Sequence, residues 1–112
     1  LVRQADKLSR AGKKGEALVL VEQALALNAA EGEALVLKAR ILLDQGKNDD
    51  ALSACESAIA GSSNNAVAWS IKGMIHYERG QSQLAKSALQ KYLELRPRAK
   101  DRDRVQAIVD SL

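Results

Sequence analysis

Apolar residues along this chain recur with the period of an α-helix, about 3.6 residues, and not with the alternation of a β-strand. Leu35, Ala39 and Leu42 stand at i, i+4 and i+7, which places them on one helical stripe. Gly46 follows this stripe, and glycine readily adopts the left-handed conformation that ends a helix. A second helical stripe comes next: Ala51, Cys55, Ala58 and Ile59. The pattern predicts two helices joined by a tight turn.

This helix–turn–helix pattern repeats at a fixed interval, because Gly12, Gly46 and Gly80 are equally spaced along the chain. The same interval relates five further sets of positions: Leu1, Leu35 and Trp69; Ala5, Ala39 and Gly73; Ala17, Ala51 and Ala85; Val21, Cys55 and Leu89; Leu25, Ile59 and Leu93. A repeat of this length is typical of a solenoid, in which each helix pair buries its apolar face against the next. The expected fold class is therefore all-α.

Polar residues and proline mark the expected helix boundaries. Asn48, Asn65 and Ser82 have side chains that can cap a following helix, and Pro97 ends the last full helix. The segment 98–112 carries one further apolar face, as expected of a terminal capping helix. The six preceding helices are expected at residues 2–11, 14–27, 31–45, 48–60, 66–79 and 82–95.

The composition of the 112 residues offers little for catalysis or metal binding. The chain has one cysteine, Cys55, and one histidine, His76, and both lie on packing stripes. One of each cannot assemble a zinc site, and no phosphate loop, nucleophile elbow or paired-carboxylate motif is present. We therefore expect no catalytic activity and no cofactor.

The charge and the hydropathy pattern restrict the partners. The net charge is +3 with both signs mixed, which favours an ordinary solvated surface over a nucleic-acid interface. No apolar run is long enough for a helix that crosses a bilayer, so no membrane span is expected. A single cysteine fits a reducing compartment such as the cytoplasm without identifying it. The chain begins at Leu1, inside an expected helix, and we interpret it as a piece of a longer protein.

The repeated positions resemble the tetratricopeptide repeat (TPR) family. The third unit matches the family pattern best, through Trp69, Gly73, His76, Gly80, Ala85, Leu89 and Pro97. The resemblance implies a right-handed α-solenoid of three antiparallel helix pairs, at residues 1–31, 32–65 and 66–99, followed by a capping helix at 100–112. It also implies a non-catalytic module for protein–protein interaction.

Two features depart from the family pattern. Tyr92 stands where the earlier units have alanine, so the last full helix is expected to dock differently. Proline is absent from Ala29 and Ser63, the positions that match Pro97, which is expected to loosen those two linkers.

In the TPR family the first helix of each pair lines a concave groove that binds a peptide or a partner helix. The exposed face of these helices is expected to carry Val2, Asp6, Ser9, Glu33, Val36, Arg40, Leu43, Val67, Ser70, Met74 and Tyr77. Among them, the expected partner-binding residues are Val36, Arg40, Leu43, Ser70, Met74, Tyr77 and Asp6. Arg40 can hold a carboxylate through two parallel hydrogen bonds. The alternative for Leu43 and Met74 is that they only complete the packing between repeats.

Three other kinds of partner are less favoured. Some TPR proteins clamp the acidic C-terminal tails of heat-shock chaperones, but the positions matched to that clamp carry no suitable group: Val2, Asp6, Leu37, Val67 and Ile71. We therefore expect no such clamp. Self-association into a homo-oligomer is the alternative function. Binding of single-stranded RNA is less favoured still, because the strict repeat interval differs from that of the related helix-pair family that reads single strands, and the basic bias is weak.

Overall fold

The computed structural model describes residues 1–28 and 31–112, and every regular element in those ranges is an α-helix. The helices are α1 (Val2–Arg10), α2 (Lys14–Leu27), α3 (Gly32–Asp44), α4 (Asn48–Gly61), α5 (Ala66–Glu78), α6 (Ser82–Leu95) and α7 (Arg102–Asp110). The bounds of α1 to α6 agree with the predicted ranges to within one residue at each end. The linker position Ala29 lies outside the described residues. Within the described ranges, no helix has the length and apolarity needed to cross a bilayer.

The three predicted glycine turns are confirmed. Gly12, Gly46 and Gly80 have φ values of +84°, +77° and +71°, in the left-handed region that side chains disfavour. After Gly46, the backbone N–H of Lys47 donates to the carbonyl of Leu42 at 2.8 Å, and equivalent bonds close the other two turns. This is the hydrogen-bonding pattern of a Schellman motif, which satisfies free carbonyls at the end of the first helix of each pair.

The predicted helix caps are partly wrong. The Asn65 side chain accepts a hydrogen bond from the Ala68 N–H at 3.2 Å and caps α5, as predicted. Asn48 and Ser82 instead are the first residues of their helices, and neither α4 nor α6 has a side-chain cap. The glycine turn leads so directly into the next helix that the cap position falls one residue earlier, on Lys47 and Gln81.

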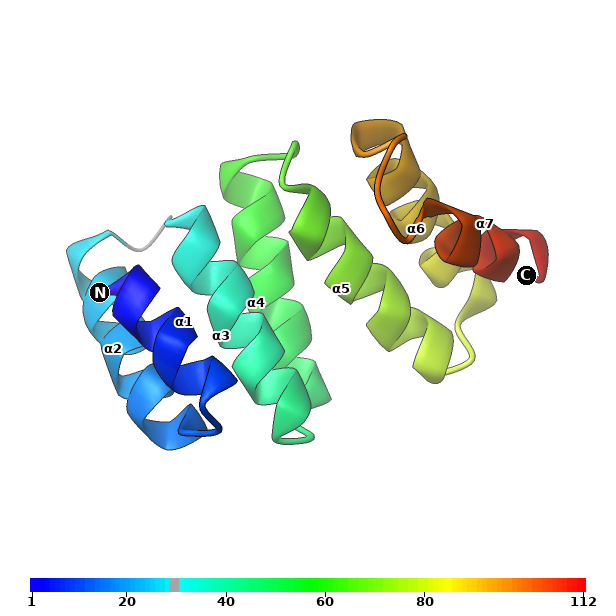
Figure 1. Ribbon diagram of the computed structural model, residues 1–112. Coiled ribbons are helices and arrows are strands. Elements are labelled where there is room, and N and C mark those ends of the chain that lie inside the picture. Colours follow the sequence, from blue (N-terminus) through cyan, green and yellow to red (C-terminus); the bar gives the residue numbers. More distant parts are fainter. Residues whose placement is uncertain (29–30) are drawn as a thin grey trace.

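The helices stack along one axis, and the solenoid is 39 Å long and 25 × 24 Å across (Figure 1). Each helix packs against the next in the chain, and α3 also contacts both α1 and α5. Within the described residues, α2 makes no comparable contact with α4, nor α4 with α6. The first helices of the pairs are therefore closer together than the second helices. This difference makes the side formed by α1, α3 and α5 the concave one.

Small residues allow the two helices of each pair to approach closely. The predicted positions Ala5, Ala17, Ala39, Ala51 and Ala85 are fully buried, and Gly73 is buried with them. Cys55 and His76 are also buried, as the packing stripes predicted. The His76 ring lies 2.7 Å from the Gln81 side-chain oxygen, measured from Nδ1, at the turn between α5 and α6.

Tyr92 joins the last full helix to the capping helix. Its ring is buried in the cluster that contains Val105 and Val109 of α7. Its hydroxyl donates a 2.6 Å hydrogen bond to the Asp101 carboxylate, immediately before α7 begins. Burial and this hydrogen bond both raise the pKa of Tyr92. Tyr92 thus helps to hold α7 on the end of the solenoid, and a different docking of α6 itself stays a prediction.

Replacing Tyr92 with phenylalanine is expected to loosen α7 selectively. The ring stays, but Asp101 loses its hydrogen-bond donor, at a cost of about 1–2 kcal/mol. Hydrogen exchange should therefore accelerate at the amides of Val105 and Val109 and stay unchanged in α3. Tyr77→Phe is the matched control, since that ring is 40% exposed. Equal protection of α7 in both variants would show that packing alone holds this helix.

Candidate functional site

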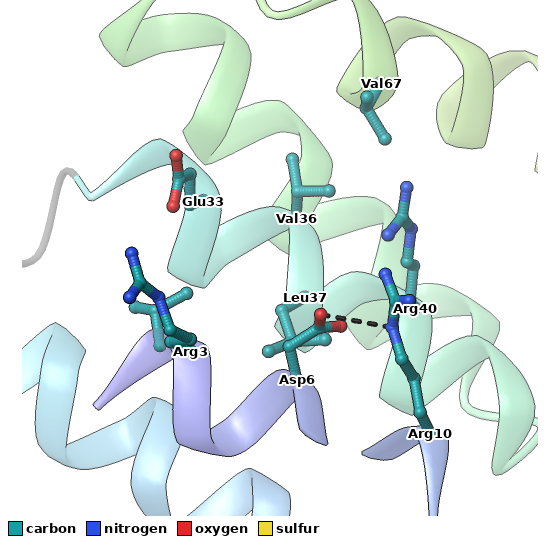
Figure 2. A pocket seen from close by; sticks show the side chains of 9 residues that line it. Arg3, Asp6, Arg10, Glu33, Val36, Leu37, Arg40 and Val67 are labelled. Carbon is teal, nitrogen blue, oxygen red and sulfur yellow. Dashed lines mark ion pairs between the residues drawn. The ribbon is translucent and has the colours of Figure 1, made fainter. Parts of the chain in front are cut away.

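A pocket of about 360 Å³ opens on the concave side, where α1, α3 and α5 meet. Figure 2 shows charged side chains around the aliphatic side chains of Val36 and Leu37. Nine residues line this inner pocket: Val2, Arg3, Asp6 and Arg10 of α1; Glu33, Val36, Leu37 and Arg40 of α3; and Val67 of α5. Every lining residue comes from the first helix of a pair, as the predicted groove requires.

The repeat spacing explains why these side chains meet. Val36 lies one repeat interval after Val2, and Arg40 lies one repeat interval after Asp6, so each pair occupies one track along the solenoid. Neighbouring tracks on one helix are separated by four residues, which is about one helical turn. Val67 in turn follows Glu33 by the same interval. Leu37 follows Arg3 by this interval as well, so four such pairs cross the inner pocket.

The inner pocket carries three guanidinium groups and two carboxylates. One charge pair is internal, since Arg10 Nε lies 3.1 Å from Asp6 Oδ2 (Figure 2). Arg3, Arg40 and Glu33 form no ion pair within the described part of the chain. Because Arg10 offsets Asp6, the repulsion that the Asp6 carboxylate would exert on an anionic ligand is reduced. Arg40 keeps its hydrogen-bonding capacity for a ligand.

The floor of the inner pocket is apolar. Val36 and Leu37 are 8% and 5% exposed, so only the edges of their side chains reach the surface. Val67 is half-buried on α5, and Val2 is half-buried on α1. An arginine beside aliphatic side chains can bind a carboxylate while an adjacent apolar group of the ligand leaves water.

The predicted binding residues divide into two groups. Asp6, Val36 and Arg40 line the inner pocket, whereas Leu43, Ser70, Met74 and Tyr77 do not. Leu43 packs against the central core, the buried cluster that includes Cys55 and Ile75. Met74 packs against the cluster around Tyr92. Ser70 is half-buried, and Tyr77 is exposed further along α5.

Two expectations about the exposed face are wrong. Ser9 is buried, and its hydroxyl accepts a hydrogen bond from Lys14 Nζ at 2.8 Å, because α1 ends there against the start of α2. Val36 is also largely buried, since the close approach of the first helices covers most of its side chain.

The sequence missed Arg3 and Arg10. Both belong to α1, and Arg10 follows Asp6 by four residues, the spacing of an ion pair on one helix face. That spacing could have identified Arg10, and the repeat interval could have identified Arg3, because Leu37 and Ile71 follow it at one and two intervals. The residues matched to the chaperone-tail clamp included Leu37 and Ile71, and both are buried. The cationic groups that line the inner pocket are at other positions.

No histidine or cysteine is among the residues that line the inner pocket in the described part of the chain. Within the described residues, no cluster of histidine, cysteine, aspartate or glutamate could hold a metal ion. Cys55 is fully buried in the central core, away from the inner pocket, and burial raises the pKa of its thiol to about 12. A thiol in this state is a poor nucleophile.

Two family models match the chain, both described as tetratricopeptide repeat, one over residues 2–66 and the other over residues 37–110. No curated protein matches the sequence. Among solved structures, the first TPR of Spaghetti (RPAP3) bound to an HSP90 peptide is similar, with a TM-score of 0.86 and 20% identity over 97% of this chain and 87% of that one.

Two further structures are similar in the same way. The TPR domain of Arabidopsis OM64 has a TM-score of 0.87 and 17% identity, covering 98% of this chain and 92% of that one. The second TPR domain of human RPAP3, in complex with an HSP70 peptide, has a TM-score of 0.82 and 19% identity, covering 97% and 88%. Identities at this level show a common fold.

Proposed function

The chain belongs to the tetratricopeptide repeat family, and on that premise we propose that it is a non-catalytic module whose concave side binds a peptide or a partner helix. The observation that carries the proposal is the inner pocket. It combines Arg40, an arginine with no ion-pair partner among the described residues, with an apolar floor, on the side of the solenoid where the first helices converge.

The ligand that fits this pocket is a segment with an acidic side chain next to an aliphatic one. Arg40 supplies two parallel hydrogen bonds to a carboxylate, and Val36 and Val67 supply the apolar contact. The helices that form the pocket are already packed, so the receptor loses little conformational freedom on binding. The similar RPAP3 structures, which hold HSP90 and HSP70 peptides, support peptide binding as a use of this fold.

The proposed groove extends beyond the inner pocket along α3 and α5. Ser70 and Met74 follow Val36 and Arg40 by one repeat interval and so continue the same two tracks. Leu43 and Tyr77 form a third track at the far ends of these helices. Tyr77 offers an exposed aromatic contact of the kind that often dominates binding energy. The tracks become uncharged toward α5, so a clamp with basic groups on both sides is not expected.

Exchanging Arg40 for glutamate is expected to abolish binding of acidic peptides. Heptapeptides from a displayed random library would first be selected on the wild-type chain, then synthesised with both ends blocked. We expect an excess of peptides with one internal Asp or Glu, bound at least about tenfold more weakly by Arg40→Glu, because a charge-assisted contact becomes a repulsion. Fluorescence polarisation measures the affinities.

Arg96→Glu is the charge-matched control, since Arg96 is exposed at the end of α6, away from the inner pocket. Tyr77→Ala tests whether the groove extends along α5. Full binding by both Arg40→Glu and Tyr77→Ala, with normal folding, would rule out the groove. Micromolar binding of an acidic chaperone-tail peptide would contradict the expectation that no such clamp is present.

A further inference from the structure

A second hollow lies on the opposite, convex side, between α3 and α4, with a volume of about 400 Å³. Its lining includes Leu35, Lys38 and Leu42 of α3 and Asp50, Ser53 and Ser57 of α4. The hollow lies between the two helices of one pair, and within the described residues α2 does not pack on α4 to cover it. This outer hollow shares no residue with the inner pocket.

The next repeat carries a larger side chain at the corresponding place. Trp69 follows Leu35 by one repeat interval, and Lys72 follows Lys38 by the same interval. In the third unit the Lys72 Nζ lies 5.5 Å from the centre of the Trp69 ring, a cation–π arrangement. The second unit keeps the lysine but has only leucine in place of the indole. Lys38 therefore stands in the outer hollow without an aromatic ring at the position that Trp69 occupies beside Lys72.

The polar groups of the outer hollow suit an aromatic ring with an N–H donor. Lys38 is held at the rim by an ion pair with Glu22 of α2, at 2.9 Å, so its ammonium group is already positioned. Asp50 forms no ion pair within the described part of the chain and can accept a hydrogen bond from an indole. Leu35 and Leu42 are buried and form an apolar floor. One indole ring can contact the Lys38 ammonium group, donate a hydrogen bond to Asp50 and pack on the apolar floor.

An apolar surface on α2 continues from the outer hollow. It includes Leu18, Val19 and Ala26, and it reaches Glu22, the residue that pairs with Lys38. Val19 is 58% exposed, while the residues at the same repeat position in the next two units are Ser53 and Ser87. The exposed Val19 side chain gives this surface an apolar contact that the next two units lack. The outer hollow and this outer strip together suit a segment with two apolar anchors.

We propose that the convex side is a second binding site, which takes an aromatic side chain of a partner peptide, tryptophan best, into the outer hollow between Lys38 and Asp50. A neighbouring apolar residue of the same peptide packs on the outer strip. This site does not depend on the proposed concave groove, and each can be tested with the other disabled.

Fragment titration followed by ¹⁵N–¹H NMR tests this proposal. The probes are N-acetyltryptophanamide and N-acetylleucinamide, added separately to the intact chain. We expect saturable shifts for the tryptophan probe at the amides of Leu35, Lys38, Ser53 and Ser57, with binding about tenfold tighter than for the leucine probe. Equal affinity for both probes, or saturable shifts confined to α1 and the concave side, would overturn it.

Variants distinguish binding in the outer hollow from non-specific binding of the probe. Ser53→Arg places a large cation at the rim and is expected to abolish the shifts, whereas Ser87→Arg, at the same repeat position in the third unit, leaves them intact. Arg40→Glu should also leave them intact. Leu35→Trp, if it folds, fills the hollow from within and competes with the probe. Light scattering across a concentration series tests whether a second copy of this chain occupies the outer hollow. A dimer that Ser53→Arg dissociates would overturn the assignment to a partner peptide.

Discussion

Substituting alanine for Gly73 is expected to lower the free energy of unfolding by about 1–2 kcal/mol, although alanine is the better helix former. A Cβ atom at this position would lie 2.6 Å from Cδ2 and 2.7 Å from Cγ of Leu89, and 3.3 Å from the Leu89 backbone nitrogen. Leu89 is fully buried on α6, so its side chain must change rotamer or α5 and α6 must separate to admit the methyl group. Urea unfolding, followed by the fluorescence of Trp69, measures the loss.

The control substitution is Gly15→Ala in α2, where an added Cβ meets nothing within 4 Å. It should stabilise the chain by less than about 1 kcal/mol through backbone entropy. A rescue is also available: Gly73→Ala combined with Leu89→Val reproduces Ala5 and Val21, the residues at these repeat positions in the first unit. If the double variant is no more stable than the sum of the single effects implies, the clash with Leu89 is not the cause.

At pH 8 the Cys55 thiol of the folded chain is expected to react with iodoacetamide on the order of 10³-fold more slowly than in the unfolded chain. Burial, the main cause, raises its pKa from the ordinary value of about 9 to about 12, so almost no thiolate exists in the native state. Mass spectrometry after timed labelling, with and without urea, measures the two rates. Rapid labelling of the native protein would show that α3, α4 and α5 separate readily.

The same pKa shift makes stability depend on alkaline pH. Well below pH 9 the Cys55 thiol is almost fully protonated in both states, so it contributes almost no pH dependence there. Between about pH 9 and pH 12 only the unfolded chain releases the proton, and the free energy of unfolding falls by up to about 1.4 kcal/mol per pH unit. Cys55→Val, which carries the residue found at Val21, should show a smaller alkaline loss. The raised pKa of Tyr92 acts in the same direction and remains in that variant.

Much of the fold could be predicted because its determinants are local. Gly46 ends α3 through its own backbone conformation, and the stripe of Leu35, Ala39 and Leu42 requires only helical geometry. The repeats then strengthened the prediction of helix pairs, because a weak match in one unit recurs at the same positions in the next. The caps were placed less well, since Asn48 was assigned from its residue type, and the preceding turn leaves the cap position on Lys47.

The candidate site was only partly predictable. The tracks through Asp6 and Arg40 follow from the repeat interval, and both residues line the inner pocket. Which tracks are open to solvent depends on how far apart the helices lie, and this is why Ser9 and Val36 proved buried. Arg3 lies one repeat interval before Leu37, which also lines the inner pocket, so the interval could have indicated it as well.

The sequence by itself determined the repeat, the helix pairs and most of the residues that pack, because helical periodicity and glycine turns act over a few residues. Only the tertiary structure decided that α1, α3 and α5 converge while α2 and α4 spread apart. That difference depends on packing between repeats, as in the core cluster that contains both Val36 of α3 and Ile71 of α5. The same curvature places the inner pocket on one side of the solenoid and the outer hollow on the other.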